Sequence, residues 1–540
     1  MAATQDPRPA SMAPRASQGM IVPLALAQFT ASYAATNMNV AISSIAKELN
    51  TTVVGMQTTI TLFTLTMASL MIPGSKLTEI WGRKRCFTLG MIIYGVGALI
   101  ASLAQGLGLM IFGYSALEGI GSALMIPPIY ILVTVAFPDT RSRAKNFGII
   151  SGAAGLGSAA GPLIGGILTS AISWRASFIA QVIVVVVILA LTPRITDPGI
   201  SGPRPAFDVW GAALCAVGLF FVVLGVLQSS TYGWFVSREN FTIGGTVVIP
   251  KGSVSPVWLF VAIGVAIVAW FLLHLRSREK KDKVPLVALR MFRNRTANLG
   301  LGTQIIQWLT LQGSFFVISV FLQQERGYSA IKTGLVLTPA TAGILIASAM
   351  AERLARRHTQ RWLIRTGFAI TAVGMALLLA LVRKDSPDIA AAPGLLLMGI
   401  GVGAMLTSSV NVVQSAFPER DQGDISGVSR SVSNLGSSLG TALAGSIIAS
   451  TLLPGNKTFA LSLVLMLVIT LGGLLIAMRL PGQPTAATAP PAPTLAPAPV
   501  AAPEPGHGPD PGPGPGPGPE PGRTKENAGR STPGPSGTSR

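Results

Sequence analysis

The apolar residues of this chain form long runs, and the polar and charged residues gather in short segments between them. A helix that crosses the hydrocarbon core of a bilayer needs about 20 mostly apolar residues. Runs of this kind predict fourteen membrane-spanning helices, and therefore an all-α integral membrane protein. The predicted helices cover residues 21–45, 53–73, 86–105, 108–130, 146–170, 174–193, 208–228, 255–275, 297–324, 329–350, 362–382, 391–415, 425–451 and 458–479.

The segments between these helices predict their orientation. Short cytoplasmic loops carry an excess of Lys and Arg, and the basic residues of this chain concentrate in alternate loops. We therefore expect both termini to be cytoplasmic. The basic residues on that side are Lys76, Arg83, Lys84, Arg85, Arg141, Arg143, Lys145, Arg194, Arg204, a cluster within 276–295, another within 353–365, and Arg420.

Composition supports a membrane protein. The 540 residues are 49% hydrophobic and only 11% charged, whereas soluble domains carry about 25% charged residues. A net charge of +19 suggests nucleic-acid binding in a soluble protein. Here the basic residues lie in short loops, so we expect the lipid bilayer as a partner and no nucleic acid. Cys86 and Cys215 have no CxxC or His neighbour, and His274 and His358 are assigned to solvated loops, so no metal site is expected.

Two segments outside the predicted helices have their own character. Residues 229–254 contain two short β-prone pieces around a Gly-Gly pair, which predict a small external hairpin. Residues 481–540 are Pro/Ala-rich and then Pro/Gly-rich. Such a composition buries too little apolar surface to fold, so we expect a disordered, partly polyproline-like tail. A docking site for Pro-binding domains is an alternative to a passive tail.

A basic motif follows the second predicted helix. A tight turn with a carboxylate and a basic cluster can join two helix ends through ion pairs that break and re-form. We interpret this segment as a gating loop, and a plain basic anchor is the alternative. The motif reads Ser75-Lys-Leu-Thr-Glu79-Ile-Trp-Gly82-Arg83-Lys84-Arg85.

Glycines crowd the fifth predicted helix, at Gly157, Gly161, Gly165 and Gly166, with Pro162 among them. Each glycine would cost a soluble helix about 0.5–1 kcal/mol relative to alanine. Within a bilayer, small residues instead allow helix backbones to approach closely. These residues therefore predict a packing hinge within the membrane, rather than a soluble phosphate-binding loop.

These motifs resemble those of the major facilitator superfamily. The residues 75–85 are similar to its loop signature G-x-L-x-D-R-x-G-R-R, and the glycines to its antiporter signature G-x-x-x-G-P-x-x-G-G. Phe207-Asp208-Val-Trp-Gly211 and Leu322-Gln323-Gln324 resemble its fourteen-helix drug:proton antiporter branch (EmrB/QacA type). The resemblance covers about residues 21–480. It implies two pseudo-symmetric six-helix halves, 21–193 and 291–480, with two extra central helices in 194–290 and a short cytoplasmic segment at 1–20.

The chain departs from that branch at two charged positions. The usual Asp of the first helix is absent from Ala34-Ala-Thr36-Asn37-Met-Asn39, and the usual Arg of the fourth is absent from Ser115-Ala-Leu-Glu118-Gly119. Glu118 stands near the middle of its predicted helix, where a carboxylate is costly and usually functional. We interpret Glu118 as the proton or cation-substrate coupling site. A protonated structural carboxyl is the alternative.

Other polar residues within the predicted helices are candidates to line a central cavity. Gln304, Gln307, Trp308 and Gln312 share one face of the ninth helix by their spacing. Arg430 could instead extend toward the membrane surface, and Asp424 could pair with Arg420 or Arg430. Each cavity candidate could equally form a hydrogen bond between helices. The remaining candidates are Tyr33, Asn37, Asn39, Tyr114, Asn411 and Asn434.

No phosphate-binding loop, zinc motif or nucleophile elbow occurs in the sequence, so neither ATP hydrolysis nor another enzymatic activity is expected. The sequence predicts a multi-pass transporter of the cell membrane, acting as a monomer. It would export lipophilic or cationic small molecules, such as drugs, by alternating access. The proton gradient would supply the energy, with no cofactor. The alternatives are a facilitator of a small metabolite and a non-transporting receptor or scaffold that uses the Pro-rich tail.

Overall fold

The structure of the protein is a computed structural model. Each of the fourteen predicted helices corresponds to one helical segment of it. It describes residues 19–137, 140–197, 207–243, 246–281, 283–417, 422–449 and 457–481, all within one unit of the chain. The predictions for the N-terminal segment 1–20, the tail 481–540 and the loop residues Arg204 and Arg420 lie wholly or almost wholly outside this part.

The N-terminal half contains seven α-helices and a π-helical turn. Predicted and observed boundaries differ by a few residues, except that the second, fourth, fifth and tenth predicted helices are longer than predicted. The fourth predicted helix is one continuous rod made of three segments. The elements are α2 (Ile21–Glu48), α3 (Val53–Trp81), α4 (Arg83–Ser102), α5 (Leu107–Met110), the π-helix η1 (Ile111–Glu118), α6 (Gly119–Ala136), α7 (Thr140–Ala171), α8 (Trp174–Leu191) and the 3₁₀ turn η2 (Thr192–Arg194).

The rest of the described chain is also helical apart from one hairpin. Its elements are α9 (Val209–Tyr232), β1 (Phe241–Ile243), β2 (Thr246–Ile249), α10 (Pro256–Lys280), η3 (Leu289–Arg293), α11 (Arg295–Val320), η4 (Phe321–Glu325), α12 (Ala330–Arg357), α13 (Gln360–Leu381), η5 (Asp388–Ala391), α14 (Ala392–Gln414), α15 (Gln422–Ile448) and α16 (Lys457–Met478).

Within the described residues, twelve helices are long and apolar enough to cross a membrane. The helices α2 and α15 are outside that set although they contain 28 and 27 residues. Both carry many Ser, Thr, Asn and Gln side chains, which lower their mean hydropathy. Both also lie inside the bundle, where polar side chains find partners on other helices.

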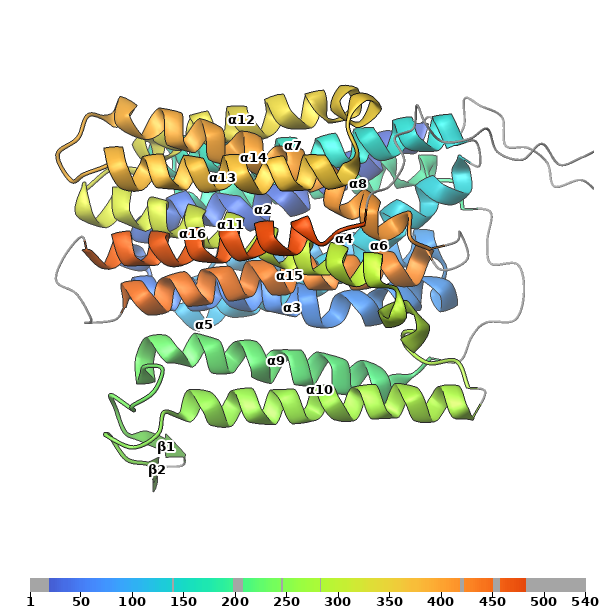
Figure 1. Ribbon diagram of the computed structural model, residues 1–540, viewed down its shortest axis with the longest axis horizontal. Coiled ribbons are helices and arrows are strands. Elements are labelled where there is room, and N and C mark those ends of the chain that lie inside the picture. Colours follow the sequence, from blue (N-terminus) through green and yellow to red (C-terminus); the bar gives the residue numbers. More distant parts are fainter. Residues whose placement is uncertain are drawn as a thin grey trace, which may run out of the picture. The chain divides into compact units, whose positions relative to one another are not determined.

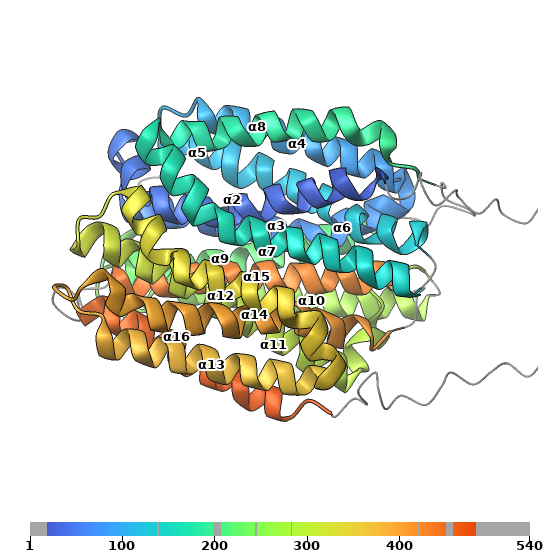
Figure 2. The same cartoon turned by 90° about the horizontal axis from the view of Figure 1, so that it is seen from above.

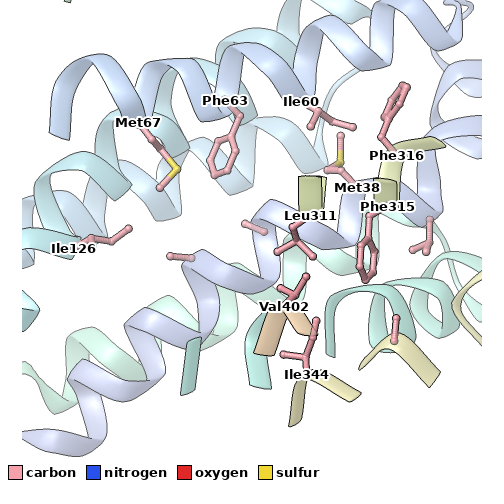
Figure 3. Packing of buried hydrophobic residues seen from close by; sticks show 14 of the residues in the cluster. Met38, Ile60, Phe63, Met67, Ile126, Leu311, Phe315, Phe316, Ile344 and Val402 are labelled. Carbon is pink, nitrogen blue, oxygen red and sulfur yellow. The ribbon is translucent and has the colours of Figure 1, made fainter. Parts of the chain in front are cut away.

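The two halves meet along two pairs of helices. In one pair α3 packs against α15, and in the other α7 packs against α12. Figures 1 and 2 show these helices running side by side along the bundle. We call this contact between the halves the seam. Close to it, Met38, Phe63, Leu311 and Phe316 belong to one buried hydrophobic cluster drawn from both halves (Figure 3).

The predicted loop between the second and third helices is almost entirely helical. The helix α3 continues to Trp81, and Gly82 alone turns the chain into α4. Gly82 has a φ of 95°, which residues with a side chain rarely adopt. The residues from Ser75 to Glu79 therefore lie on a rigid helix end rather than in a flexible loop, and the prediction of a loop is wrong there.

The two extra helices lie at the edge of the bundle. Figure 1 shows α9 and α10 as an antiparallel pair beside α3, and α9 contacts both α3 and α15. Between them β1 and β2 form the antiparallel hairpin that the sequence predicted, with Phe241 opposite Ile249. Its location on the external side stays a prediction. The extra helices are thus central in the sequence but peripheral in space.

A buried carboxylate, that of Asp208, connects α9 to α10. Asp208 caps α9 by accepting a hydrogen bond from the Gly211 amide at 3.0 Å. His274 of α10 contacts the same carboxylate at 3.0 Å, and Arg278 lies 3.4 Å from it. His274 is therefore in a helix and paired, not in a solvated loop as the sequence predicted.

Asp208→Ala should destabilise the protein more than Asp208→Asn does. Loss of the cap costs about 1 kcal/mol and occurs only with alanine, whereas both variants leave Arg278 without this carboxylate. Asparagine keeps an oxygen that can accept from Gly211. Thermal unfolding of the purified variants measures the difference, and equal losses would contradict the role of the cap.

Candidate functional site

The glycines of α7 permit the close approach of two other helices. A Cβ atom on Gly157 would collide with the Phe29 carbonyl of α2, and one on Gly166 would lie 2.7 Å from the Ala330 carbonyl of α12. A Cβ atom on Gly165 would lie 3.0 Å from the Cβ atom of Asn37 in α2. The helix α7 is therefore held between α2 of its own half and α12 of the other half. The glycines of this motif thus lie at close contacts between helices, and the movement of α7 as a hinge stays a prediction.

Glu118 ends the π-helical turn η1 and is completely buried. Its surroundings belong to the N-terminal half. The amide of Glu118 approaches α4 at Gly97, where no side chain intervenes, and the hydroxyls of Tyr94 and Tyr114 are the nearest titratable groups. Neither carboxyl oxygen has a hydrogen-bond partner of normal geometry. The group is thus a buried carboxyl whose nearest titratable neighbours belong to its own half.

Aromatic rings and hydroxyls enclose this carboxyl. Phe63 stacks on Tyr114 with ring centroids 4.5 Å apart, and Phe178 meets it edge-on at 6.0 Å. The Tyr94 hydroxyl donates to Gln181 of α8, and the Tyr33 hydroxyl donates to Ser177 of α8 at 3.2 Å. Tyr33 therefore points into the N-terminal half rather than across the seam. Its prediction as a cavity residue finds no support in this orientation.

The glutamines of α11 are buried, as their spacing suggested. Gln304 accepts a hydrogen bond from Ser429 of α15 at 2.8 Å, and Gln307 accepts one from Ser409 of α14 at 2.9 Å. Each leaves its amide nitrogen without a partner. They therefore join helices of the C-terminal half and retain hydrogen-bonding capacity. Trp308 is only partly buried and packs against the main core.

The other cavity candidates are distributed between the seam and the surface. Asn37 and Asn39 are buried in α2, and each has one amide atom without a partner. Asn434 is partly exposed, and Asn411 is exposed. The structure thus brings the α2 asparagines and the α11 glutamines near the bundle interior, but not Asn411.

Hydrogen bonds cross the seam between α2 and α11. Gln312 donates to the Ala35 carbonyl at 3.2 Å. The side chains of Ser319 and Gln323 both donate to the Asn39 carbonyl. Gln323 also accepts from the Ser43 amide at 3.0 Å. Sequence reasoning noted Gln323 only as part of a motif and missed this role, because the partner atoms are backbone groups that no motif encodes.

The other end of the seam is closed by cations. Arg430 of α15 donates to the Tyr130 hydroxyl of α6 and lies over its ring, 4.5 Å from the centroid. Tyr130 in turn donates to Gln28 of α2 at 3.4 Å. Arg430 therefore reaches across to the other half instead of extending to the membrane surface.

Lys76 makes the second cationic contact at this end. Its ammonium group lies 2.8 Å from Asp424 of α15 and 3.0 Å from Glu79. Asp424 therefore pairs with Lys76. Of the two partners that the sequence suggested, Arg430 instead contacts Tyr130, and Arg420 lies outside the described residues. Nearby, Arg83 lies 3.7 Å from Asp197, which also accepts from the Lys84 amide at 3.2 Å. The sequence analysis missed Asp197, although an acidic residue within a basic loop was a usable signal.

A double-mutant cycle on Lys76→Met and Asp424→Asn should show coupling of about 1 kcal/mol, as expected for a partly exposed ion pair. The Lys76→Met variant leaves two carboxylates facing each other, so we expect it to lower transport several-fold. Adding Asp424→Asn should restore part of that loss. Transport rates of the four proteins measure the coupling, and additive effects would contradict it.

A cavity of about 240 Å³ lies at the end of the seam opposite to Lys76. Gln57 of α3, Gln324 of η4 and Gly445 of α15 are among its lining residues, so both halves contribute to it. Gln57 is buried and donates to the Ala442 carbonyl of α15 at 3.2 Å. This contact is the counterpart of the Lys76 pair at the other end of the same two helices.

Comparison with known proteins identifies the family. The model of the Major Facilitator Superfamily matches residues 24–441 and, again, 301–505. The chain belongs to the major facilitator superfamily. The family resemblance inferred from the motifs is therefore confirmed, and so is the prediction of a multi-pass membrane transporter rather than an enzyme.

Relatives of this major facilitator carry names from drug resistance and export. It is 26% identical to multidrug resistance protein Stp of Mycobacterium tuberculosis, over 77% of this chain and 73% of the relative. It is 25% identical to a probable actinorhodin transporter of Streptomyces coelicolor, over 76% and 69%. It is 27% identical to the puromycin resistance protein pur8 of Streptomyces alboniger, over 80% and 82%.

Proposed function

We propose that this chain is a proton-coupled exporter of lipophilic or cationic small molecules such as antibiotics. The observation that carries the proposal is Glu118, a completely buried carboxyl that no cation of the described residues neutralises. The ionised form of such a group is costly within a membrane, and ionisable residues kept there usually serve a function such as proton transfer. The names of the relatives support drugs as the substrates.

Fourteen membrane spans fit this proposal better than twelve. The helices α2 and α15 are as long as their neighbours and are surrounded by them, so their polar side chains do not require contact with lipid. An even number of spans would put both termini on the same side, which we propose is the cytoplasm. We further propose that the chain belongs to the drug:proton antiporter branch, which has fourteen helices, and that it acts as a monomer in the cell membrane.

Alternating access would open the seam at one end at a time. At the proposed cytoplasmic end, opening would break the contacts of Lys76 with Asp424 and of Arg430 with Tyr130. At the opposite end it would break the bonds of Gln323 and Gln57. Each of these two sets of contacts is small and polar. The glycine packing of α7 would allow the halves to rock.

A facilitator is the second candidate, because the charged Asp and Arg of the related branch are missing from the first and fourth helices. Drug uptake into inverted vesicles under an imposed proton gradient distinguishes the exporter from the facilitator. An exporter should accumulate a fluorescent drug substrate only while the gradient exists, and an ionophore should release it. Transport that the ionophore leaves unchanged would favour the facilitator.

A further inference from the structure

The hydrogen bonds around Glu118 run in one fixed direction. The amide nitrogen of Gln181 donates to the Ser177 backbone carbonyl at 3.3 Å. A carbonyl can only accept, so the side-chain oxygen of Gln181 must face the Tyr94 hydroxyl. That oxygen also only accepts, so Tyr94 must be the donor in its bond to Gln181. The single hydroxyl hydrogen of Tyr94 is therefore committed to Gln181.

The second tyrosine beside Glu118 is committed as well. The Tyr114 hydroxyl donates to the Ala34 carbonyl at 3.0 Å, which again can only accept. Ser115 donates to the Thr59 carbonyl at 2.7 Å. No ion pair to Glu118 occurs among the described residues. An ionised carboxylate here would have neither a donor nor a cation, at a cost of several kcal/mol. The arrangement fits a neutral, protonated Glu118.

We propose that Tyr94 senses the proton on Glu118 by moving its hydroxyl hydrogen between two acceptors. It donates to Gln181 while Glu118 is protonated, and it donates to the carboxylate after Glu118 releases its proton. In the balance of this step, the O–H bond of Glu118 breaks and the proton passes to water, while Tyr94 exchanges its hydrogen bond to Gln181 for one to the carboxylate. This inference rests on the proposed role of Glu118 as the proton site.

The exchange links the proton to the seam. When Tyr94 turns to Glu118, Gln181 loses the donor that ties α8 to α4. The same face of α8 carries Ser177, which receives the Tyr33 hydroxyl of α2. Two residues beyond Tyr33, the Ala35 carbonyl accepts from Gln312 across the seam. Proton release thus weakens the support of the α2 segment that contacts α11. Tyr94 is a positioning residue in this scheme.

Infrared spectra of the full chain in lipid vesicles test the proposal. The carboxyl C=O band that disappears in Glu118→Gln reports protonated Glu118. We compare samples at the pH where the native band is half its maximum. Tyr94→Phe removes the donor for the carboxylate, so the ratio of protonated to ionised Glu118 should rise about tenfold, the worth of one hydrogen bond to a charged group.

Two further variants make the test specific. Gln181→Met removes the competing acceptor, so the ratio should fall instead of rising. Tyr114→Phe is the matched control, since its hydroxyl is bound to a backbone carbonyl, and it should leave the ratio near that of the native protein. A purely structural role for Tyr94 would not give opposite changes.

The possible failures are distinguishable. If the Glu118 band titrates but Tyr94→Phe and Gln181→Met shift it in the same direction or not at all, the role of Tyr94 is wrong and the proposed proton site stands. If no titrating band belongs to Glu118 and Glu118→Gln keeps its proton coupling, the proton site itself is wrong and the role of Tyr94 with it.

Discussion

Gly157→Val is expected to leave little active transporter in the membrane. A Cβ atom at this position would collide with the backbone carbonyl of Phe29, and backbone atoms cannot turn aside as a flexible side chain can. The helices α7 and α2 would have to separate along their contact. Such overpacking typically costs about 1–3 kcal/mol. We expect at least a tenfold loss of drug export, measured together with the amount of protein in the membrane.

Gly152→Val is the matched control in the same helix. Gly152 has no atom within 4 Å of the position where its Cβ would lie, so valine meets no obstacle there. This variant should export at close to the native rate. Equal losses in the two variants would mean that glycine matters for the flexibility of α7, not for its packing.

Glu118→Gln is expected to abolish uphill drug export and leave the fold intact. Glutamine has nearly the shape of glutamate and carries no charge, so it should replace a protonated carboxyl at little cost in stability. It cannot release a proton, so coupling should be lost. We expect export against a gradient to fall about 100-fold or more, since 100-fold is the lower end of the range for loss of a proton-transfer group.

Two measurements accompany this variant. Thermal unfolding should show a stability close to that of the native protein. Glu118→Asp keeps the ionisable group and should retain part of the export. A large loss of stability in Glu118→Gln, with export unchanged in the protein that remains folded, would instead support a structural role for the carboxyl.

The helices of this protein could be predicted from the sequence because a membrane makes their pattern simple. Apolar runs of span length with charges between them leave few alternatives. The exceptions have local causes. The helix α3 continues to Trp81 through Pro73 and Gly74, the point at which the prediction ended it. The end of this helix was not predicted because residues 74–81 carry polar and charged side chains, as a loop does.

The partners of the charged residues could not be predicted in the same way. The sequence indicated that Glu118 is buried and that a carboxylate and basic residues meet near Lys76. It did not show that Asp424 lies opposite Lys76, because these residues are far apart in the chain and belong to different halves. Nor could it show that Asp208 joins His274, which depends on the pairing of α9 with α10.

The most direct test of this account is proton flux in inverted membrane vesicles. The vesicles are first acidified inside, and a panel of lipophilic cations and neutral drugs is then added to the native protein and to Glu118→Gln. We predict that at least one compound releases protons from vesicles that contain the native chain. No compound should release protons from vesicles that contain the Glu118→Gln variant. Movement of compounds by both proteins without any proton movement would contradict proton-coupled export.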